Sequence, residues 1–193
     1  MQQMSDADIW DTIRPEHLWV VDKLLLAKQL GYRCGPAGVR VSVAGHYIVR
    51  PCVNFRMMSR GATVQYLSPD LDDLHSVPDG HFWCEIFIGR HLSFDYHWGQ
   101  QVLAVEGFRD SDRLDRFCRW EKVSDQFVLP DVLKPIAATN QWLNVEVIGD
   151  KIIEVHFRYN DDFANHESSV IVPVWKDQFY PSACGDRVGF LLK

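Results

Sequence analysis

The stretch from Leu143 to Arg158 limits the possible folds of this chain more than any other, because it predicts a β-hairpin that carries charged side chains. Two runs rich in valine and isoleucine flank the turn sequence Gly149-Asp150, as is typical of paired antiparallel strands. Glu146 and Glu154 lie eight positions apart across that turn, so paired strands can present both carboxylates on one surface. His156 comes two positions after Glu154 and therefore lies on the same face of its strand.

Glu146, Glu154 and His156 together indicate a metal site. Carboxylate oxygens suit Mg²⁺ held against the phosphates of a nucleotide, and we expect all three side chains to be ligands. Because a neutral imidazole binds Mg²⁺ poorly, Mn²⁺ is the alternative ion. Two alternatives stay open: the hairpin is a plain surface hairpin with glutamate opposite lysine or arginine, or His156 only hydrogen-bonds to a ligand.

Composition sets wider limits. A chain of 193 residues that is 47% hydrophobic can bury one sizeable core, which two lobes can share. The net charge of -6 argues against a general nucleic-acid coat. Five cysteines without a CxxC pair, and the lack of a long apolar span, favour a cytoplasmic protein with buried thiols and no membrane partner.

The periodicity of apolar residues predicts a mixture of helices and strands. Helices are expected over 5–12, 15–30 and 128–142. Strands are expected over 39–43, 46–54, 63–67, 81–88, 91–97, 101–108, 170–175 and 188–192, with a turn over 35–38. The connection 68–80 has no periodicity and is expected to separate two lobes, and 81–108 is expected to form an antiparallel meander.

The order of these elements, together with four short motifs, resembles the ATP-grasp family from Asp22 to about Asn160. In chain order the motifs are Asp22-Lys23 followed by Gly31, Tyr47-Ile-Val-Arg-Pro51, Phe82-Trp-Cys-Glu-Ile-Phe-Ile-Gly89 with Leu92-Ser-Phe-Asp95, and Asn144-Val-Glu146 with Glu154-Val-His-Phe-Arg158. The brevity of the chain is similar to that of small ATP-grasp-like proteins encoded by bacteriophages.

This resemblance implies an α+β protein with the ATP-grasp fold, in which two α+β lobes with antiparallel sheets grip a nucleotide cleft. The whole chain, 1–193, would be a single ATP-grasp-like domain. Its N-terminal lobe, about 15–80, would carry a lid loop, and its C-terminal lobe, about 81–193, would carry the metal-binding hairpin.

The resemblance also implies roles for individual residues. Arg50 would contact the phosphates of ATP, Arg158 would lie beside the transferring phosphoryl group, and Glu146 and Glu154 would hold Mg²⁺. The residues implied to bind the nucleotide are Arg50, Glu85, Ile86, Phe87, Ile88 and His91, with Arg56 and Arg60 from the lid loop. An ion pair with Asp95 is the structural alternative for Arg50.

Three features depart from the family pattern. The lid loop is poor in glycine, so charge on Arg56 and Arg60 would replace backbone dipoles. His91 stands where a ribose-binding acid is usual. The family usually places an acceptor-binding domain before Asp22, where this sequence has 21 residues, so the acceptor site would come from loops, from a C-terminal element or from a protein partner.

By resemblance, the expected activity is that of an ATP-dependent carboxylate–amine ligase that forms an acylphosphate intermediate. Its partners would be the nucleotide and a small or protein-borne carboxylate acceptor. Two alternatives stay open: a non-catalytic ATP-binding or interaction module that has kept the fold, and a small-molecule kinase.

Overall fold

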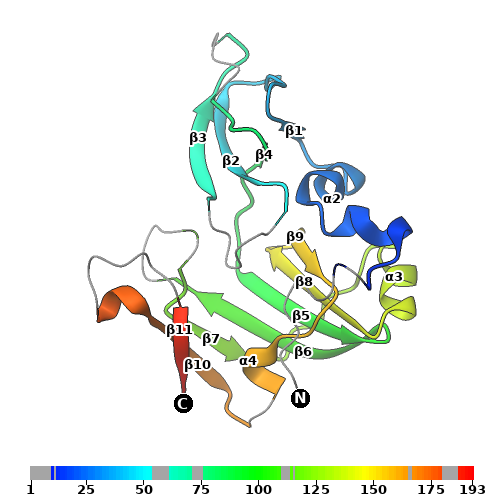
Figure 1. Cartoon of the computed structure of the whole chain (residues 1–193), viewed down its shortest axis with the longest axis vertical. Helices are drawn as coiled ribbons and strands as arrows, with labels where there is room; N and C mark the ends of the chain where they lie inside the picture. Colours follow the sequence, from blue (N-terminus) through cyan, green and yellow to red (C-terminus); the bar gives the residue numbers. More distant parts are fainter. Residues whose placement is uncertain are drawn as a thin grey trace.

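The computed structural model describes residues 10, 12–53, 61–70, 76–109, 114, 116–164, 167–179 and 187–193. Two antiparallel sheets dominate this part of the chain (Figure 1). The small sheet has four strands in the order β1-β4-β2-β3. The large sheet has seven strands in the order β11-β10-β7-β6-β5-β8-β9.

The small sheet is built from β1 (Cys34–Pro36), β2 (Gly45–Pro51), β3 (Thr63–Leu67) and β4 (His81–Glu85). The prediction for β3 is confirmed, and β2 ends earlier than predicted. The predicted strand over 39–43 is wrong, and β1 forms where a turn was expected. The absence of a side chain at Gly35 explains the difference, because a Cβ there would lie 2.6 Å from the Trp83 ring, so only glycine allows this close pairing.

The chain crosses between the sheets at residues 86–90. The strands β4 and β5 (His91–His97) were expected to form a hairpin, but β4 pairs with β1 and β2, and β5 pairs with strands of the large sheet. The small sheet therefore extends to Glu85, and the segment 68–80 connects two strands of that sheet rather than two lobes. The crossing passes close to the turn of the late hairpin, since a Cβ on Gly89 would lie 2.6 Å from the Cα atom of Gly149.

Six further strands complete the large sheet. They are β6 (Gln100–Phe108), β7 (Arg119–Lys122), β8 (Trp142–Ile148), β9 (Lys151–His156), β10 (Val170–Trp175) and β11 (Arg187–Leu192). The predicted hairpin is confirmed as β8 and β9, and β10 and β11 also form as predicted. The sequence did not predict β7, whose four residues carry little alternation of apolar and polar side chains.

The helices are shorter than their apolar patterns suggested. The predicted helix over 15–30 is two helices, η1 (Pro15–Val20) and α2 (Lys23–Gln29), because the Asp22 carboxylate accepts hydrogen bonds from the backbone of Leu24 and Leu25 and starts a new helix. The helix expected over 128–142 is confined to α3 (Lys134–Thr139). Two short helices, α4 (Asp161–Ala164) and η2 (Lys176–Gln178), complete the set. The helix expected over 5–12 lies almost entirely outside the described residues.

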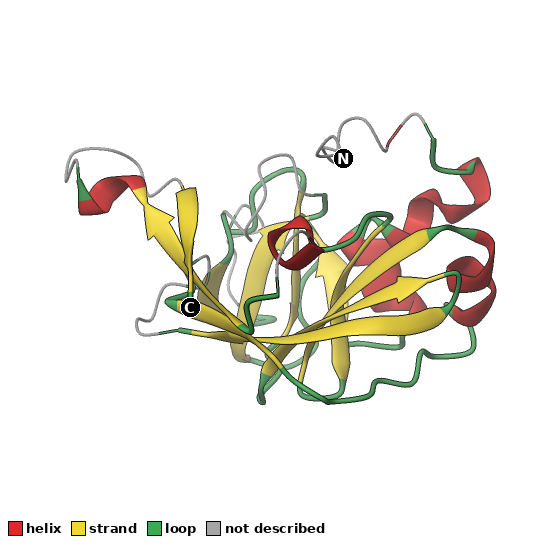
Figure 2. Cartoon of the chain, turned by 90° about the horizontal axis from the view of Figure 1, so that it is seen from below, coloured by secondary structure: helices red, strands yellow, loops and turns green. Residues whose placement is uncertain are grey.

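The two faces of the large sheet differ in polarity. Its apolar face packs against η1, α2 and α3, which gather at one end of the molecule (Figures 1 and 2). The buried strand residues of this core include Leu92, Phe94, Tyr96, Leu143, Val145 and Val147. The opposite face of the same strands is polar and carries the candidate site. None of the described helices is long and apolar enough to span a membrane.

Candidate functional site

Polar side chains from three adjacent strands line one face of the large sheet. The register places Glu146 of β8 opposite Ser93 of β5 on one side and opposite Glu154 of β9 on the other. Directly opposed side chains in antiparallel strands point to the same face, so the two carboxylates come together as the hairpin pattern predicted. Asp95 and Asn144 extend the row, again as a directly opposed pair.

A β-bulge in the hairpin connects this row to the small sheet. Glu146 pairs with Glu154 and Val147 pairs with Ile152, so Ile153 is an extra residue without a cross-strand partner. The Ile153 carbonyl instead accepts a hydrogen bond of 2.9 Å from Nη2 of Arg50. The bulge therefore provides an acceptor that brings the β2 arginine to the late hairpin.

Arg50 is buried, with a relative exposure of 8%. Its guanidinium lies 5.2 Å from the centre of the Phe82 ring. Among the described residues its Nε has no hydrogen-bond partner. Burial lowers the pKa of Arg50, and the Glu154 carboxylate offsets part of this effect. A buried guanidinium with an unused donor is costly unless a further acceptor reaches it, so this position is suited to an anionic ligand.

The alternative considered for Arg50, an ion pair with Asp95, is not formed. Asp95 is buried and accepts hydrogen bonds of 2.7 Å from the Asn144 side chain and 2.8 Å from the backbone nitrogen of Asn160. Burial raises the pKa of Asp95 to about 6 in spite of these bonds. Asp95 therefore hydrogen-bonds to the segment after β9 and does not pair with Arg50 of β2.

Glu154 lies between the side chains of Lys23 and His156. Nζ of Lys23, at the start of α2, lies 3.6 Å from one carboxylate oxygen, and Nε2 of His156 lies 2.9 Å from the other. Burial alone would raise the pKa of the Glu154 carboxyl, but Lys23 and His156 outweigh burial and hold the pKa below its ordinary value. The carboxylate is therefore ionised and is already compensated by side chains of the protein.

Glu146 has its own partner on β5. Nε2 of His91 lies 3.0 Å from the Glu146 carboxylate, and Nδ1 of the same ring lies 3.2 Å from Nη2 of Arg109. Because a guanidinium can only donate, Nδ1 accepts and the proton of a neutral His91 ring resides on Nε2, where it is donated to Glu146. His91 thus links a carboxylate of the row to an arginine at the end of β6.

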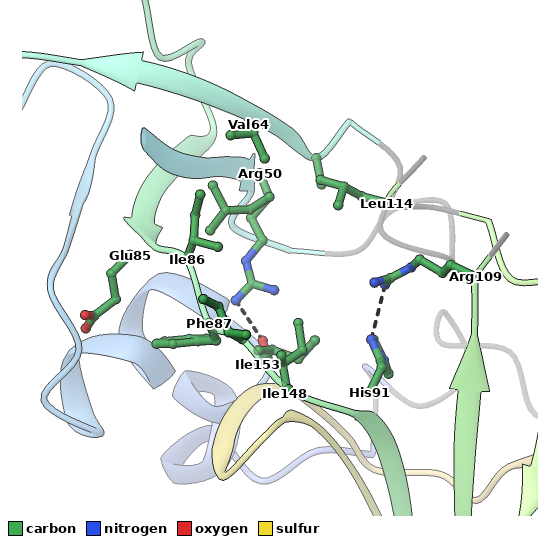
Figure 3. A pocket seen from close by; sticks show the side chains of 14 residues that line it. Arg50, Val64, Glu85, Ile86, Phe87, His91, Arg109, Leu114, Ile148 and Ile153 are labelled. Atoms are coloured by element: carbon green, nitrogen blue, oxygen red, sulfur yellow. Dashed lines mark hydrogen bonds between the residues drawn. The ribbon is translucent and has the colours of Figure 1, made fainter. Parts of the chain in front are cut away.

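A cavity of about 340 Å³ lies where the crossing segment meets both sheets (Figure 3). It contains most of the residues that were predicted to bind a nucleotide: Arg50, Glu85, Ile86, Phe87, Ile88 and His91 all line it. Ile48, Val64, Ile148 and Ile153 make its walls largely apolar. Arg50 and Arg109 supply positive charge from different sides of the cavity (Figure 3).

The side chain of Glu85 points away from Arg50 (Figure 3), and its carboxylate accepts a hydrogen bond of 2.8 Å from the backbone nitrogen of Arg33. Arg158 is not among the residues that line the cavity; its Nη1 lies 3.4 Å from the Tyr159 carbonyl oxygen, beyond the end of β9. Arg56 and Arg60 of the predicted lid loop lie outside the described residues.

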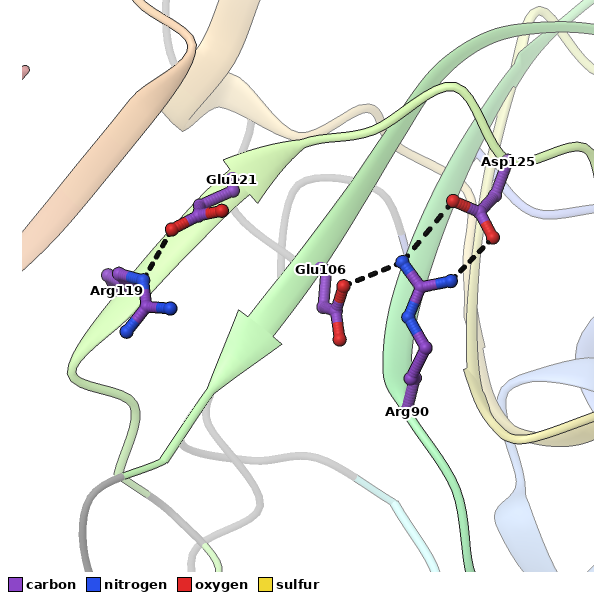
Figure 4. Close-up of polar contacts among 5 residues, drawn as sticks. All are labelled: Arg90, Glu106, Arg119, Glu121 and Asp125. Atoms are coloured by element: carbon purple, nitrogen blue, oxygen red, sulfur yellow. Dashed lines mark hydrogen bonds and ion pairs between the residues drawn. The ribbon is translucent and has the colours of Figure 1, made fainter.

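Arg90 anchors the end of the crossing segment on the large sheet (Figure 4). Its guanidinium donates to Glu106 of β6 at 2.6 Å and to Asp125 at 2.7 Å. A second ion pair in the same view joins Arg119 and Glu121. Arg90 thereby fixes the large-sheet end of the connection that forms one wall of the cavity.

The donor chemistry of Glu146 and Glu154 fits a magnesium ion, because Mg²⁺ in nucleotide sites uses one or two carboxylates and completes its shell with phosphate oxygens and water. No group of three or more histidine, cysteine or acidic residues is arranged for a metal ion in the described part of the chain. His156 is a hydrogen-bond partner of Glu154 here, at 2.9 Å, and its role as a third metal ligand stays a prediction. Mn²⁺ was the alternative ion only because His156 was predicted to be a metal ligand.

Two residues of the site were not predicted from the sequence. Lys23 belongs to a recognised motif, but its contact with Glu154 depends on how α2 packs beside β9. The one local feature that points to burial of Lys23 is its position next to the buried Leu24 at the start of the helix. Arg109 contacts His91 only because β5 and β6 pair with His91 opposite Gly107, and a single sequence gives no sign of that register.

Comparisons with known proteins identify solved structures that align with much of this chain. N5-carboxyaminoimidazole synthetase from Staphylococcus aureus, in complex with ADP, aligns over 91% of this chain and 68% of its own, with 9% identity and a TM-score of 0.53. L-amino acid ligase from Bacillus licheniformis aligns over 80% of this chain and 44% of its own, with 12% identity and a TM-score of 0.50. The ATP-grasp ligase PsnB, in complex with a minimal precursor, Mg and ADP, aligns over 76% of this chain and 53% of its own, with 14% identity and a TM-score of 0.49.

No protein-family model matches the chain, and no curated protein sequence matches it. The chain spans 44% to 68% of the length of the three solved chains described above. At such low identities the likeness establishes the fold, and the predicted α+β class is confirmed.

Proposed function

We propose that this chain is an ATP-grasp protein that binds ATP in the cavity between its two sheets and acts as an ATP-dependent carboxylate–amine ligase. The likeness of its fold to an L-amino acid ligase and to N5-carboxyaminoimidazole synthetase in complex with ADP supports the proposal. The observation that carries the proposal is Arg50. Its buried guanidinium keeps an unused donor among the described residues and faces an apolar cavity, next to two ionised carboxylates on the adjoining hairpin. A ligand with a flat apolar part and an anionic part matches these features.

The base of the nucleotide would lie against the crossing segment. Ile86, Phe87 and Ile148 offer an apolar surface for a planar ring, and the irregular backbone of residues 86–88 offers amide and carbonyl groups outside any sheet ladder. The cavity volume of about 340 Å³ lies within the ordinary range for small-molecule sites.

The phosphates would extend toward Arg50 and the hairpin. Arg50 would bind phosphate oxygens through the donor that no described residue uses, and its bond to Ile153 fixes its direction. Mg²⁺ would be held by Glu146 and Glu154 and would neutralise charge on the phosphates. His91 orients Glu146 through the hydrogen bond from its Nε2.

In the proposed reaction an oxygen of the acceptor carboxylate attacks the γ-phosphorus of ATP, and the bond to the β-phosphate oxygen breaks to release ADP. An amine then attacks the carbonyl carbon of the acylphosphate, and inorganic phosphate leaves. Arg50 would stabilise charge on the transferring group, and Arg158 is proposed to meet the acceptor side. The acceptor is a small acid or a carboxylate presented by a protein partner.

One observation favours the non-catalytic alternative, an ATP-binding module. The Glu154 carboxylate already interacts with Lys23 and His156, so a metal ion would bind there less favourably than at an unpaired carboxylate. Such a protein would bind the nucleotide with little dependence on metal and would not convert ATP to ADP. A small-molecule kinase would release ADP without needing an amine.

Calorimetry and turnover assays test these functions. The ligase predicts ATP binding that strengthens with Mg²⁺, and ADP release that requires both an acid and an amine from mixed pools. Glu154→Gln should abolish the metal dependence, whereas the exposed Glu167→Gln should not change it. ATP affinity that is indifferent to Mg²⁺ in the wild type, with no ADP release in any pool, would reject the ligase in favour of the binding module.

A further inference from the structure

The edge strand of the small sheet places two cysteines directly opposite each other. Cys34 of β1 is the cross-strand partner of Cys84 of β4. Both thiols are free, Cys84 is fully buried and Cys34 is partly buried. The two side chains therefore project from neighbouring strands toward the same face of the sheet.

The hydrogen bonds that flank the pair show which kind of cross-strand site it is. The backbone nitrogen of Glu85 donates to the carbonyl of Arg33, and that of Ala37 donates to the carbonyl of His81. Hydrogen-bonded pairs alternate with non-hydrogen-bonded pairs along an antiparallel ladder, so Cys34 and Cys84 form a non-hydrogen-bonded pair. In such pairs the Cα atoms are about 4.5 Å apart and the side chains are at their closest. This separation lies within the roughly 4.4–6.8 Å that a disulfide spans.

The remaining thiol of this region is not placed to compete. Cys52 belongs to the same apolar cluster on the α2 side of the sheet, but its backbone nitrogen donates to the carbonyl of Gly80. Gly80 is four residues before Cys84, which corresponds to roughly 13 Å along a strand. Cys34 therefore has Cys84 as its in-register thiol partner.

We propose that Cys34 and Cys84 are a redox modification site that forms a cross-strand disulfide by exchange with a small-molecule disulfide such as oxidised glutathione. The more accessible Cys34 loses its proton and attacks one glutathione sulfur, which releases one glutathione thiolate and leaves a mixed disulfide. Cys84 then loses its proton and attacks the Cys34 sulfur, which releases the second glutathione thiolate. The two protein thiols are oxidised, and the glutathione disulfide is reduced to two thiols.

This disulfide would fix the edge strand next to the connection between the sheets. Tyr32, two residues before Cys34, accepts a hydrogen bond of 2.9 Å from the backbone nitrogen of Ile152 in the late hairpin. The Tyr32 ring also packs edge-on against Phe87 of the crossing segment, with ring centres 4.8 Å apart. A bond from Cys34 to Cys84 thus ties β1, and the segment before it that carries these contacts, to β4 inside the small sheet.

Peptide mapping of the native protein tests the pairing. Each cysteine of the sequence falls in a different tryptic peptide, and Cys34 lies in 34–40 while Cys84 lies in 61–90. The protein is incubated with oxidised glutathione at alkaline pH, because burial raises the pKa of both thiols and slows exchange at neutral pH. Remaining thiols are alkylated before digestion without reductant. We expect 34–40 joined to 61–90, and 41–56, which contains Cys52, recovered in alkylated form.

Variants separate this pairing from other oxidation. Cys52→Ser should leave the joined peptides unchanged, and Cys34→Ser should leave Cys84 alkylated. Joining of either peptide to any other, or recovery of both in alkylated form, would overturn the proposal. The oxidised wild type should also unfold at a temperature roughly 5–10 °C higher than the reduced protein, because the bond closes a long loop. No rise in the fully joined protein would overturn the proposal that the native sheet accommodates this disulfide.

Discussion

Nη2 of Arg50 donates to the carbonyl oxygen of Ile153 at 2.9 Å, and this bond joins residues that are 103 positions apart in the sequence. Arg50 belongs to the small sheet and Ile153 to the bulge of the hairpin in the large sheet. The bond orients one cation of the cavity toward the strands that carry Glu146 and Glu154. The proposed nucleotide site depends on this convergence of two sheets.

Replacement of Arg50 should affect anionic ligands selectively. Arg50→Met keeps most of the apolar stem but removes the donors, so ATP affinity should fall by roughly 10- to 100-fold while adenosine affinity changes far less. Calorimetry with both ligands measures the difference. Arg40→Met, which removes an exposed arginine from the same lobe, is the matched control for net charge. Equal losses for ATP and adenosine would show that Arg50 does not meet phosphate.

The buried pair of Lys23 and Glu154 should contribute to stability. Lys23→Met leaves the Glu154 carboxylate buried without its ammonium partner, so the free energy of unfolding should fall by about 3–5 kcal/mol. Lys28→Met changes an exposed lysine of the same helix and should have little effect. Urea denaturation compares the two variants, and adding Glu154→Gln to Lys23→Met should restore part of the loss. A Lys23 variant as stable as the Lys28 variant would mean that the ion pair is not needed for folding.

The close approach of Gly89 to Gly149 should make the crossing segment intolerant of any side chain. In Gly89→Ala the new Cβ would lie 2.6 Å from the backbone of Gly149, so the hairpin turn and the cavity wall must shift. Gly80→Ala is the matched control, because Gly80 also has a positive φ of 73° but nothing lies within 4 Å of a Cβ there. Gly89→Ala should lower the midpoint of urea denaturation more than Gly80→Ala does. Equal shifts would show that only backbone strain matters.

Asp95 should give the stability a measurable pH dependence. Its pKa is about 6 in the folded protein, against an ordinary value of 3.8, so between these pH values the folded state binds more protons than the unfolded state. The free energy of unfolding should therefore fall as pH rises from about 4 to 6, by up to about 3 kcal/mol from this group. Asp95→Asn should lack this component, which urea denaturation across the range would reveal. Parallel pH profiles of the variant and the wild type would contradict the assignment.

The local patterns of the sequence were sufficient to predict the late hairpin. Valine and isoleucine runs around Gly149-Asp150 specify two strands and a turn, and the strand period of two places Glu146 and Glu154 on one face. The bulge at Ile153 was not predictable, because it shows only in the pairing and not in the residue types. The contact of Arg50 with the hairpin depends on that bulge.

Tertiary contacts decided one incorrect prediction, and a local signal decided another. The pattern over 81–97 suits a hairpin, but β4 pairs within the small sheet because Phe82 and Cys84 are buried against α2. The helix expected over 15–30 was divided by a local signal, since Asp22 caps α2 and prevents continuity with η1. Contacts such as Lys23 with Glu154 arise only when α2 packs beside β9.

A structure of the protein with a non-hydrolysable ATP analogue and Mg²⁺ tests the central claim most directly. We predict that the base lies against Phe87 and Ile148, that phosphate oxygens lie within hydrogen-bonding distance of Arg50, and that the metal contacts Glu146 and Glu154. A cavity that stays empty at a saturating analogue concentration, or a nucleotide bound elsewhere on the chain, would contradict this account.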